Sequence, residues 1–390
     1  MLSELLTKKK TLIVVGPGGV GKTTTAASFA VHAARSGLKT LVLTVDPARR
    51  LANSLGLEEL GNQEVRIDPE QFAEAGVDLG DGELWGMMLD TKSTFDAVIE
   101  RYAPTREIRD KIFSNAFYKQ ASTALAGSQE YMAMEKLYEI REQRSYDLIV
   151  LDTPPTANAL DFLSAPERLE DFLGSGSTGM LMRSMKAAGR VGLGLLKVNA
   201  FVLRGLNRFV GADTFVDLLD FISSFDQMYG GFKARARRVR EILRSPDVAF
   251  VIVTSTAEAA IDEGGFFYDQ LVRGRMPFGA VVVNRVREPF MEDGDLDGLA
   301  DHLIHAARAA DEMKGFDGYH VSRFLERAAH ACVDYETLAR VDADRVAAVR
   351  ERFERDRDKV YPVPLFERDI HDIGSLARFA DHVAAVEAAG

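Results

Sequence analysis

The stretch Gly16-Pro17-Gly18-Gly19-Val20-Gly21-Lys22-Thr23 decides the fold of this chain. It matches the pattern G-x-x-x-x-G-K-[ST], in which glycines let consecutive backbone N–H groups curve around a phosphate. An apolar run at residues 11–15 precedes it, and a helical pattern at residues 22–36 follows it. This strand–loop–helix context predicts a P-loop. Lys22 would then contact the β- and γ-phosphates of a nucleotide, and the Thr23 hydroxyl would bind Mg²⁺.

Short apolar runs rich in Val, Ile and Leu recur along the chain and predict parallel strands that are buried on both faces. They lie at residues 11–15, 40–45, 147–151, 249–254 and 278–284, with weaker candidates at residues 84–89 and 360–363. Helical patterns alternate with these runs. The order predicts an α/β fold, namely a doubly wound, mostly parallel P-loop sheet with an inserted helical subdomain.

Two long stretches without strand signals define the predicted subdomain, and charged helical patterns define a further insertion. We expect the nucleotide-binding domain to comprise residues 1–94, a switch II part at residues 145–165 and a C-terminal part at residues 246–390. We expect the helical subdomain to comprise residues 95–144 and 166–245, and the further helical insertion to span residues 288–359.

Composition excludes several classes of protein. The chain has 390 residues, with Lys+Arg 48 against Asp+Glu 59 and a formal net charge of -11, which disfavours a nucleic-acid partner. No run approaches the roughly 20 apolar residues of a transmembrane helix. A single cysteine, Cys332, fits a reducing cytoplasm and cannot form an internal disulfide or a thiolate metal site. We expect Cys332 to be a buried small residue in a helix.

Two aspartates stand at predicted strand ends. Asp46 ends the run at residues 40–45, and Asp152 ends the run at residues 147–151. Because ligands bind at the carboxyl edge of a parallel sheet, both carboxylates should face the nucleotide. Asp152 is then the expected partner of Mg²⁺ through water, and Asp46 would orient or deprotonate the attacking water. The alternative for each is a helix N-cap after a strand.

Together these segments resemble the ArsA-type ATPases, the family of arsenite-efflux and tail-anchored-protein-targeting ATPases. The resemblance rests on the P-loop with its second threonine at residues 16–24, Asp-Pro-Ala at residues 46–48 and Asp-Thr-Pro-Pro-Thr at residues 152–156. The family has a deviant P-loop and works as a nucleotide-sandwich dimer. Within it, residues 126–131 and 158–163 resemble a bacterial subfamily that is encoded as adjacent pairs of unequal paralogues.

The resemblance assigns roles to individual residues. Asp46 and Lys22 are implied to be catalytic, Asn284 to contact adenine, and Pro364 and Phe366 to pack beside the base. The implied nucleotide-binding set is Gly16, Gly18, Gly19, Val20, Gly21, Lys22, Thr23, Thr24, Asn284, Pro364 and Phe366. Thr23 and, through water, Asp152 are the implied Mg²⁺ ligands. The implied switch residues are Asp46, Pro47, Arg49 and Arg50, followed by Asp152, Thr153, Pro154, Pro155 and Thr156.

Pro17 departs from the family pattern. The deviant P-loop carries a second lysine directly after its first glycine, which reaches across the dimer to the nucleotide of the other subunit. Here that position is proline, which has neither a charge nor a donor. We hypothesise that a paralogous subunit that carries the lysine completes the site. Arg49 or Arg50 could supply the charge instead, or these arginines form only a solvated helix start.

The predicted activity is Mg²⁺-dependent hydrolysis of ATP, which drives a dimeric switch that binds a protein client or partner. Met180, Met182 and Met185 lie in a glycine-rich segment and could line a groove for a hydrophobic client, or could pack in a core. The alternatives are a soluble ATPase subunit of an anion transporter, a partition- or division-type ATPase, and a small-molecule kinase. A thiol-based arsenite site is not supported by one cysteine.

Overall fold

The computed structural model of the chain describes residues 2–45, 50–58, 60–116, 118–119, 129–143, 145–154, 221, 224, 228–291, 296, 298–309 and 318–389. Some predictions therefore fall outside the described residues. These are the switch residues Asp46, Pro47, Arg49, Pro155 and Thr156, the glycine-rich segment with Met180, Met182 and Met185, and most of the second predicted part of the helical subdomain.

The core of the molecule is an eight-stranded sheet with the strand order β3-β4-β2-β5-β1-β6-β7-β8. The strands are β1 Thr11–Val15, β2 Lys39–Thr44, β3 Val65–Arg66, β4 Glu83–Met88, β5 Leu148–Asp152, β6 Val248–Ser255, β7 Phe278–Val286 and β8 Val360–Pro364. All neighbouring strands are parallel except β3 and β4. The predicted α/β fold class is confirmed.

All seven apolar runs that were named as strand candidates form strands, including the two weaker ones. Among the described strands only β3 was not predicted, because it is a two-residue exposed edge strand without an apolar run. Successive side chains of β1 enter opposite layers of the core: Ile13 and Val15 pack in one hydrophobic cluster, and Leu12 and Val14 in the other. This alternation is why the run reads as continuously apolar.

Helices cover both faces of the sheet, as a doubly wound fold requires. They are α1 Leu2–Lys8, α2 Lys22–Arg35, α3 Arg50–Ser54, α4 Pro69–Glu74, α5 Thr91–Tyr102, α6 Arg106–Ser114, α8 Gln129–Gln143, α13 Tyr229–Leu243, α14 Glu258–Gly274, α15 Leu299–Ala309, α16 Gly318–Arg352 and α17 Ile373–Ala389. A 3₁₀ helix, η3, spans Glu354–Lys359. Phe29 of α2 and Phe379 of α17 pack in one layer of the core, whereas Leu137 of α8 and Phe267 of α14 pack in the other.

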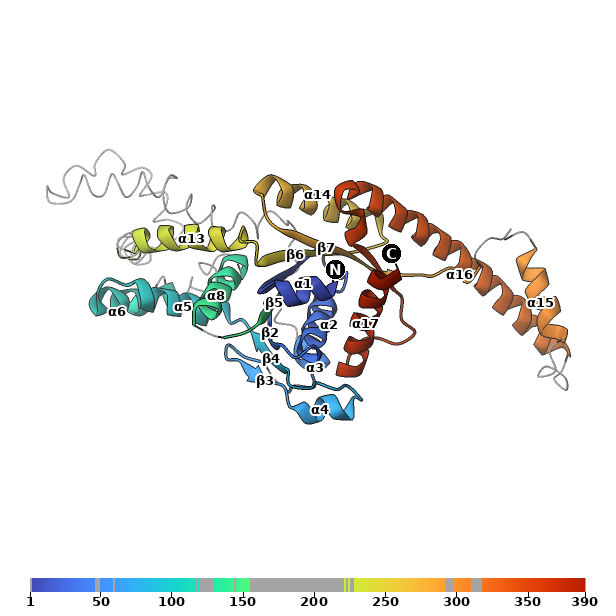
Figure 1. Cartoon of the computed structure of the whole chain (residues 1–390), viewed down its shortest axis with the longest axis horizontal. Helices are drawn as coiled ribbons and strands as arrows, with labels where there is room; N and C mark the ends of the chain where they lie inside the picture. The colour runs from blue at the N-terminus through green and yellow to red at the C-terminus, as the bar shows by residue number, and fades with distance from the viewer. Residues whose placement is uncertain are drawn as a thin grey trace, which may run out of the picture.

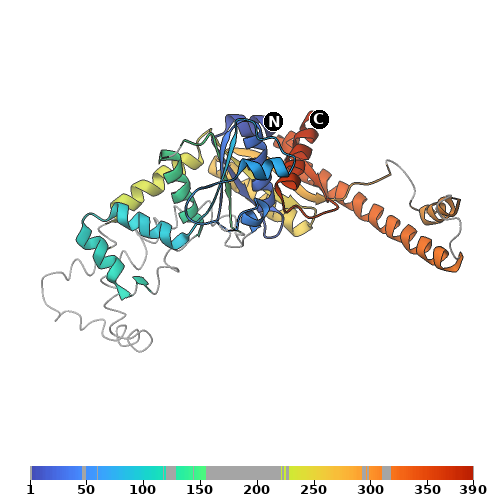
Figure 2. The ribbon, with the colours of Figure 1, turned by 90° about the horizontal axis from the view of Figure 1, so that it is seen from below.

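Two helical parts lie at opposite ends of the molecule (Figures 1 and 2). Helices α5, α6, α8 and α13 gather at one end (Figure 1). A buried ion pair, Arg235 Nε to Glu135 Oε1 at 2.7 Å, joins α13 to α8. Helices α15 and α16 project from the other end (Figure 2), within the predicted insertion. The division of the chain into domains stays a prediction.

Cys332 corrects one expectation. It lies in a helix, α16, as predicted, but it is exposed rather than buried. The physical reason is that α16 leaves the body of the protein, so its outward face has no core against which to pack. Among the described helices, none is both long and apolar enough to cross a membrane.

Candidate nucleotide site

The backbone of the P-loop depends on glycine at specific positions. Gly16, Gly19 and Gly21 have φ values of 148°, 78° and 100°, which residues with a Cβ rarely adopt. A Cβ at Gly16 would lie 2.0 Å from the carbonyl oxygen of Val253, and one at Gly21 would lie 2.3 Å from the Asn284 amide nitrogen. The loop is therefore held close to β6 and β7 by contacts that only glycine allows.

Lys22 begins α2 and is 6% exposed. Its Nζ donates to the carbonyl oxygens of Gly16 at 2.9 Å and Pro17 at 2.8 Å, so the ammonium lies across the loop. The first turn of α2 contains no acidic residue. The positive end of this helix and the ammonium therefore act on the same space, which favours an anion there.

Thr23 and Asp152 are brought together as predicted for a Mg²⁺ site. Thr23 Oγ1 donates to Asp152 Oδ2 at 2.8 Å, and Asp152 is fully buried at the end of β5. Thr44, at the end of β2, donates its hydroxyl to the same oxygen at 2.8 Å. Sheet register explains the meeting, because Asp152 pairs with Thr44 on one side and with Val14 on the other.

This donor set fits Mg²⁺, which prefers carboxylate, hydroxyl and water oxygens. Thr44 was not predicted, although a signal for it exists in the sequence. It is a polar residue that ends an otherwise apolar run, on the same edge of the sheet as Asp152.

Three of the predicted switch residues besides Asp152 lie in the described part of the chain. Thr153 is buried, and its Oγ1 donates to Val14 O at 2.8 Å. Pro154 is also buried, and Arg50 begins α3.

Asn284 braces the P-loop from β7. It is 6% exposed; its Nδ2 donates to Val20 O at 2.8 Å, and its Oδ1 accepts from the backbone N–H of Arg285 at 2.9 Å. Arg285 has a φ of 60°, which is uncommon for a residue other than glycine. Its Nη1 donates to Gly19 O at 3.5 Å. Arg285 was missed by the sequence reasoning, although it directly follows the predicted Asn284.

A cavity of about 670 Å³ opens over this loop, within the usual range for a ligand site. Its lining includes eight of the predicted nucleotide-binding residues: Gly19, Gly21, Lys22, Thr23, Thr24, Asn284, Pro364 and Phe366. Gly16 and Val20 support the loop through their carbonyl oxygens, and Gly18 is exposed in it. Basic side chains outnumber acidic ones in this lining, which has one carboxylate, that of Asp369, and the basic residues Lys22, Arg50, Arg285, Arg368 and His371. The charge favours a polyphosphate.

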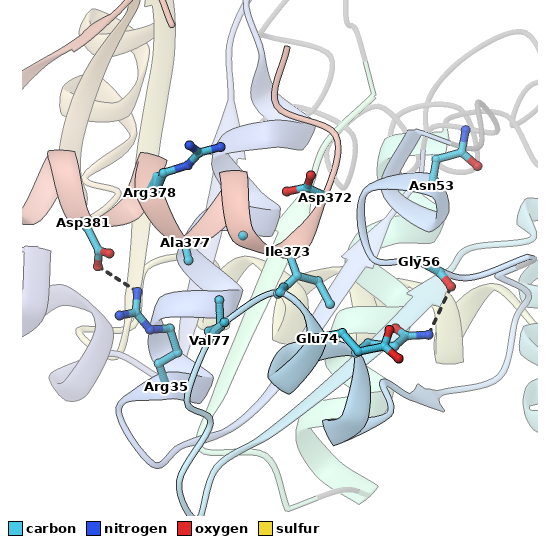
Figure 3. Close-up of a pocket in the computed structure, with 14 residues that line it drawn as sticks. Arg35, Asn53, Gly56, Glu74, Val77, Asp372, Ile373, Ala377, Arg378 and Asp381 are labelled. Atoms are coloured by element: carbon cyan, nitrogen blue, oxygen red, sulfur yellow. Dashed lines mark hydrogen bonds and ion pairs between the residues drawn. The ribbon is translucent and has the colours of Figure 1, made fainter. Parts of the chain in front are cut away.

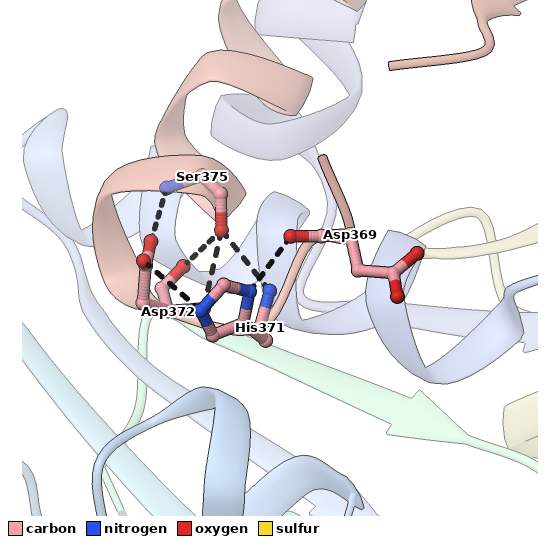
Figure 4. Close-up of polar contacts among 4 residues, drawn as sticks. All are labelled: Asp369, His371, Asp372 and Ser375. Atoms are coloured by element: carbon pink, nitrogen blue, oxygen red, sulfur yellow. Dashed lines mark hydrogen bonds and ion pairs between the residues drawn. The ribbon is translucent and has the colours of Figure 1, made fainter. Parts of the chain in front are cut away.

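The loop after β8 lines the other side of the cavity. Figure 4 shows its polar contacts with the start of α17. Asp372 Oδ1 accepts from the backbone N–H of Ser375 at 2.7 Å, and Ser375 Oγ accepts from the N–H of Asp372 and of His371, each at 3.1 Å. Reciprocal capping of this kind fixes the start of α17. The hydrogen bonds that Ser375 donates, first of all from its backbone N–H, hold the pKa of the Asp372 carboxyl below its usual value. His371 Nδ1 lies 2.7 Å from Asp369 O.

Glu263 on α14 is a further acidic group near the P-loop. Burial raises the pKa of its carboxyl, and the positive charge of Lys22 partly opposes that rise. Glu263 was not predicted, because it lies within a helix and no motif identifies it.

A second cavity of about 800 Å³ lies beside the first, between α4 and α17 (Figure 3). It shares Asn53 of α3 with the nucleotide cavity. Two contacts cross it: Arg35 Nη1 to Asp381 Oδ1 at 2.8 Å, and Gln71 Nε2 to Gly56 O at 3.2 Å. Its lining has three carboxylates and two arginines, so it lacks the excess of basic groups of the first cavity.

Comparisons with known proteins agree with this geometry. The ATPase GET3 of Malassezia globosa is 30% identical over 174 residues, which are 44% of this chain and 47% of that protein. An uncharacterized protein, SCO2128, of Streptomyces coelicolor is 34% identical over 165 residues, 42% of this chain and 39% of that protein. The ATPase ARSA1 of Chlamydomonas reinhardtii is 27% identical over 334 residues, 80% of this chain and 39% of that protein.

The chain thus spans about half or less of the length of these relatives. A family model, ArsA_ATPase, described as anion-transporting ATPase, matches residues 9–297, which contain the P-loop, Asp152 and Asn284. The match covers most of the chain and includes every described β-strand except β8. The chain belongs to the ArsA family of anion-transporting ATPases.

Proposed function

We propose that this chain binds ATP with Mg²⁺ in the cavity over the P-loop and hydrolyses it to ADP and phosphate. The observation that carries the proposal is the meeting of Lys22, Thr23 and Asp152 at one edge of the sheet. Three segments distant in sequence provide a buried ammonium, a hydroxyl and a carboxylate. These are the groups that phosphoryl transfer to water requires.

In this proposal each residue has one task. The Lys22 ammonium turns from its present carbonyl acceptors to the β- and γ-phosphate oxygens and neutralises the charge that develops there. Thr23 and, through water, Asp152 would hold Mg²⁺, which neutralises negative charge on the same oxygens when bound. Asp46 would orient the attacking water for in-line displacement.

We further propose that the chain works in the cytoplasm as a nucleotide-driven dimer that binds a protein client or partner. Pro17 supports pairing with a paralogous subunit. Its side chain is buried in the P-loop, and its carbonyl oxygen accepts from Lys22, so this position offers no cation to a neighbouring subunit. A subunit with lysine here would supply the charge that a homodimer of this chain lacks at both sites.

Two measurements on the purified chain test the ATPase activity and the need for a paralogous subunit. They are steady-state ATP hydrolysis with Mg²⁺ and an ATP-binding titration. Tight binding with negligible turnover supports the pairing proposal, and addition of the lysine-bearing subunit should then restore turnover. Binding with ready turnover by the chain alone supports the ATPase and refutes the need for a second kind of subunit. Absence of ATP binding refutes the nucleotide site.

The family description favours a second candidate, a soluble ATPase subunit of an anion transporter. With one cysteine in the sequence, such a role would use an oxyanion that is bound without thiols. Stimulation of ATP hydrolysis by an oxyanion, with no effect of a hydrophobic helical peptide, would favour this candidate over client binding.

A further inference from the structure

Helix α16 leaves the body of the protein with only one side covered by its own chain. It has 35 residues, so it is about 50 Å long, and it projects from the sheet in both views (Figures 1 and 2). Its covered side is held by Arg287 Nη1 to Asp342 Oδ2 at 2.9 Å and by the Phe290 N–H to Glu336 Oε2 at 3.0 Å. Beside this covered side, the surface from Phe324 to Leu338 is largely exposed, although the Tyr335 ring stacks on that of Phe290 with 6.4 Å between the ring centroids.

This exposed surface carries an apolar seam. Phe324 is 65% exposed, Leu338 47% and Tyr335 41%, and Ala331 between them is also exposed. The seam residues, Phe324, Ala328, Ala331, Tyr335 and Leu338, are spaced alternately by four and three positions. Such spacing is typical of a helix that packs along a second helix in a coiled coil.

The seam is symmetric about Ala331. Phe324 lies seven residues before it and Leu338 seven residues after it, so both are two helical turns from the centre. A second α16 that runs antiparallel about a two-fold axis at Ala331 would set each Phe324 against Leu338 of the other copy. The small side chain of Ala331 at the axis would let the two backbones approach closely.

Charge follows the same symmetry. Arg327 and Asp334 are exposed, lie seven residues apart on one flank of the seam and are centred beside Ala331. In the described part of the chain neither has an ion pair. The antiparallel arrangement places Arg327 of each copy beside Asp334 of the other, which forms two reciprocal pairs. We propose that α16 is a self-association surface that binds the α16 seam of a second copy of this chain, antiparallel and without nucleotide.

This contact is separate from the proposed nucleotide-driven dimer, because no residue of the seam lines the nucleotide cavity. The seam spans about 20 Å of helix, which is short for a stable interface of about 1,600 Å². We therefore expect a reversible dimer with a dissociation constant in the micromolar range. Binding of this strength would hold two copies near each other between cycles of the nucleotide site.

Sedimentation velocity of the full chain without nucleotide, over a series of concentrations, tests the proposal. We expect a monomer–dimer equilibrium that Leu338→Glu abolishes. Arg327→Glu and Asp334→Arg should each weaken the dimer about tenfold, because each replaces two attractive pairs by two repulsive ones. The double variant should restore the wild-type dissociation constant. Arg350→Glu, an exposed residue of the same helix beyond the seam, is the matched charge control and should leave it unchanged.

A monomer at all concentrations would overturn the proposal, and so would a dimer that the single charge reversals leave intact. Failure of the double variant to restore the dimer would overturn the antiparallel arrangement. Helical content of each variant, measured by circular dichroism, separates lost association from lost folding. Sedimentation velocity of the Lys22→Ala variant over the same concentrations separates the nucleotide site from the α16 seam, because loss of nucleotide binding should leave this dimer intact.

Discussion

The P-loop edge of the sheet and helix α16 differ in how far their proposed functional side chains are buried. At the P-loop edge, Lys22, Asn284 and Asp152 are nearly or fully buried, and each has hydrogen-bond partners from other segments. Along α16, Phe324 and Leu338 are largely exposed. In the first region the fold gathers polar groups around a cavity, whereas the second leaves apolar area in water.

The two regions differ in how their side chains can act. Preorganised polar groups at the P-loop can act on charge without rearranging the fold. The seam of α16 lies outside both hydrophobic clusters of the core, although Val346 and Val349 of the same helix belong to one of them, so the seam residues are available for an interaction. Substitutions should therefore separate the two regions cleanly: at the P-loop they change activity and stability, and on the seam of α16 they change association alone.

The largest expected effect is on catalysis at the P-loop. Lys22→Ala should reduce ATP turnover about 10³-fold or more, because it removes the buried ammonium that faces the phosphates. Phosphate release measured at saturating ATP checks this. Lys92→Ala, at an exposed lysine of α5, is the control and should leave turnover unchanged. Equal turnover in the Lys22 variant would end the proposed mechanism.

A pair of phenylalanine substitutions compares the core with the seam of α16. Phe250→Ala in β6, which is fully buried, should lower the free energy of unfolding by about 3–5 kcal/mol, because it leaves a cavity. Phe324→Ala on α16 should change it by less than about 0.5 kcal/mol. Urea denaturation at low protein concentration measures both. A large loss for Phe324→Ala would mean that the seam of α16 is part of the core.

A second pair distinguishes two glycines within the P-loop. Gly16→Ala should cost about 2–5 kcal/mol of stability, because the new Cβ meets the Val253 carbonyl in addition to the unfavourable φ. Gly19→Ala meets no atom within 4 Å and should cost only about 1–2 kcal/mol. Thermal unfolding of both variants checks the order. A larger loss of stability for Gly19→Ala than for Gly16→Ala would mean that a Cβ at Gly16 does not meet the Val253 carbonyl.

A smaller loss of stability than at the P-loop glycines is expected at the start of α17. Hydrogen bonds from Ser375 lower the pKa of Asp372 in the folded state. The ionised carboxylate of Asp372 therefore stabilises the fold above its unfolded pKa of about 3.9, and this contribution is lost as the pH falls through the lower pKa of the folded state. Asp372→Ala should therefore cost about 0.5–1 kcal/mol at pH 7. The difference from wild type should vanish well below pH 4. A constant difference at both pH values would contradict the capping role.

Much of the nucleotide site could be predicted from local sequence. The P-loop pattern identified Lys22 and Thr23, and the position of Asp152 after an apolar run placed it at the same edge of the sheet. Thr44, Arg285 and Glu263 were missed. Their contacts depend on the register between strands and on how α14 lies against the loop, and neither follows from residue spacing.

The sequence alone was enough to predict the described strands other than β3, the phosphate loop and the family, because apolar runs and glycine spacing act over a few residues and are set by local chemistry. The tertiary structure was needed to show that Asp152 receives two threonine hydroxyls and that Asn284 braces the P-loop. It also decided that Cys332 and the seam of α16 face water. The helical pattern of α16 is the same whether its apolar side is covered or exposed. Which of the two occurs depends on the direction in which the helix leaves the sheet.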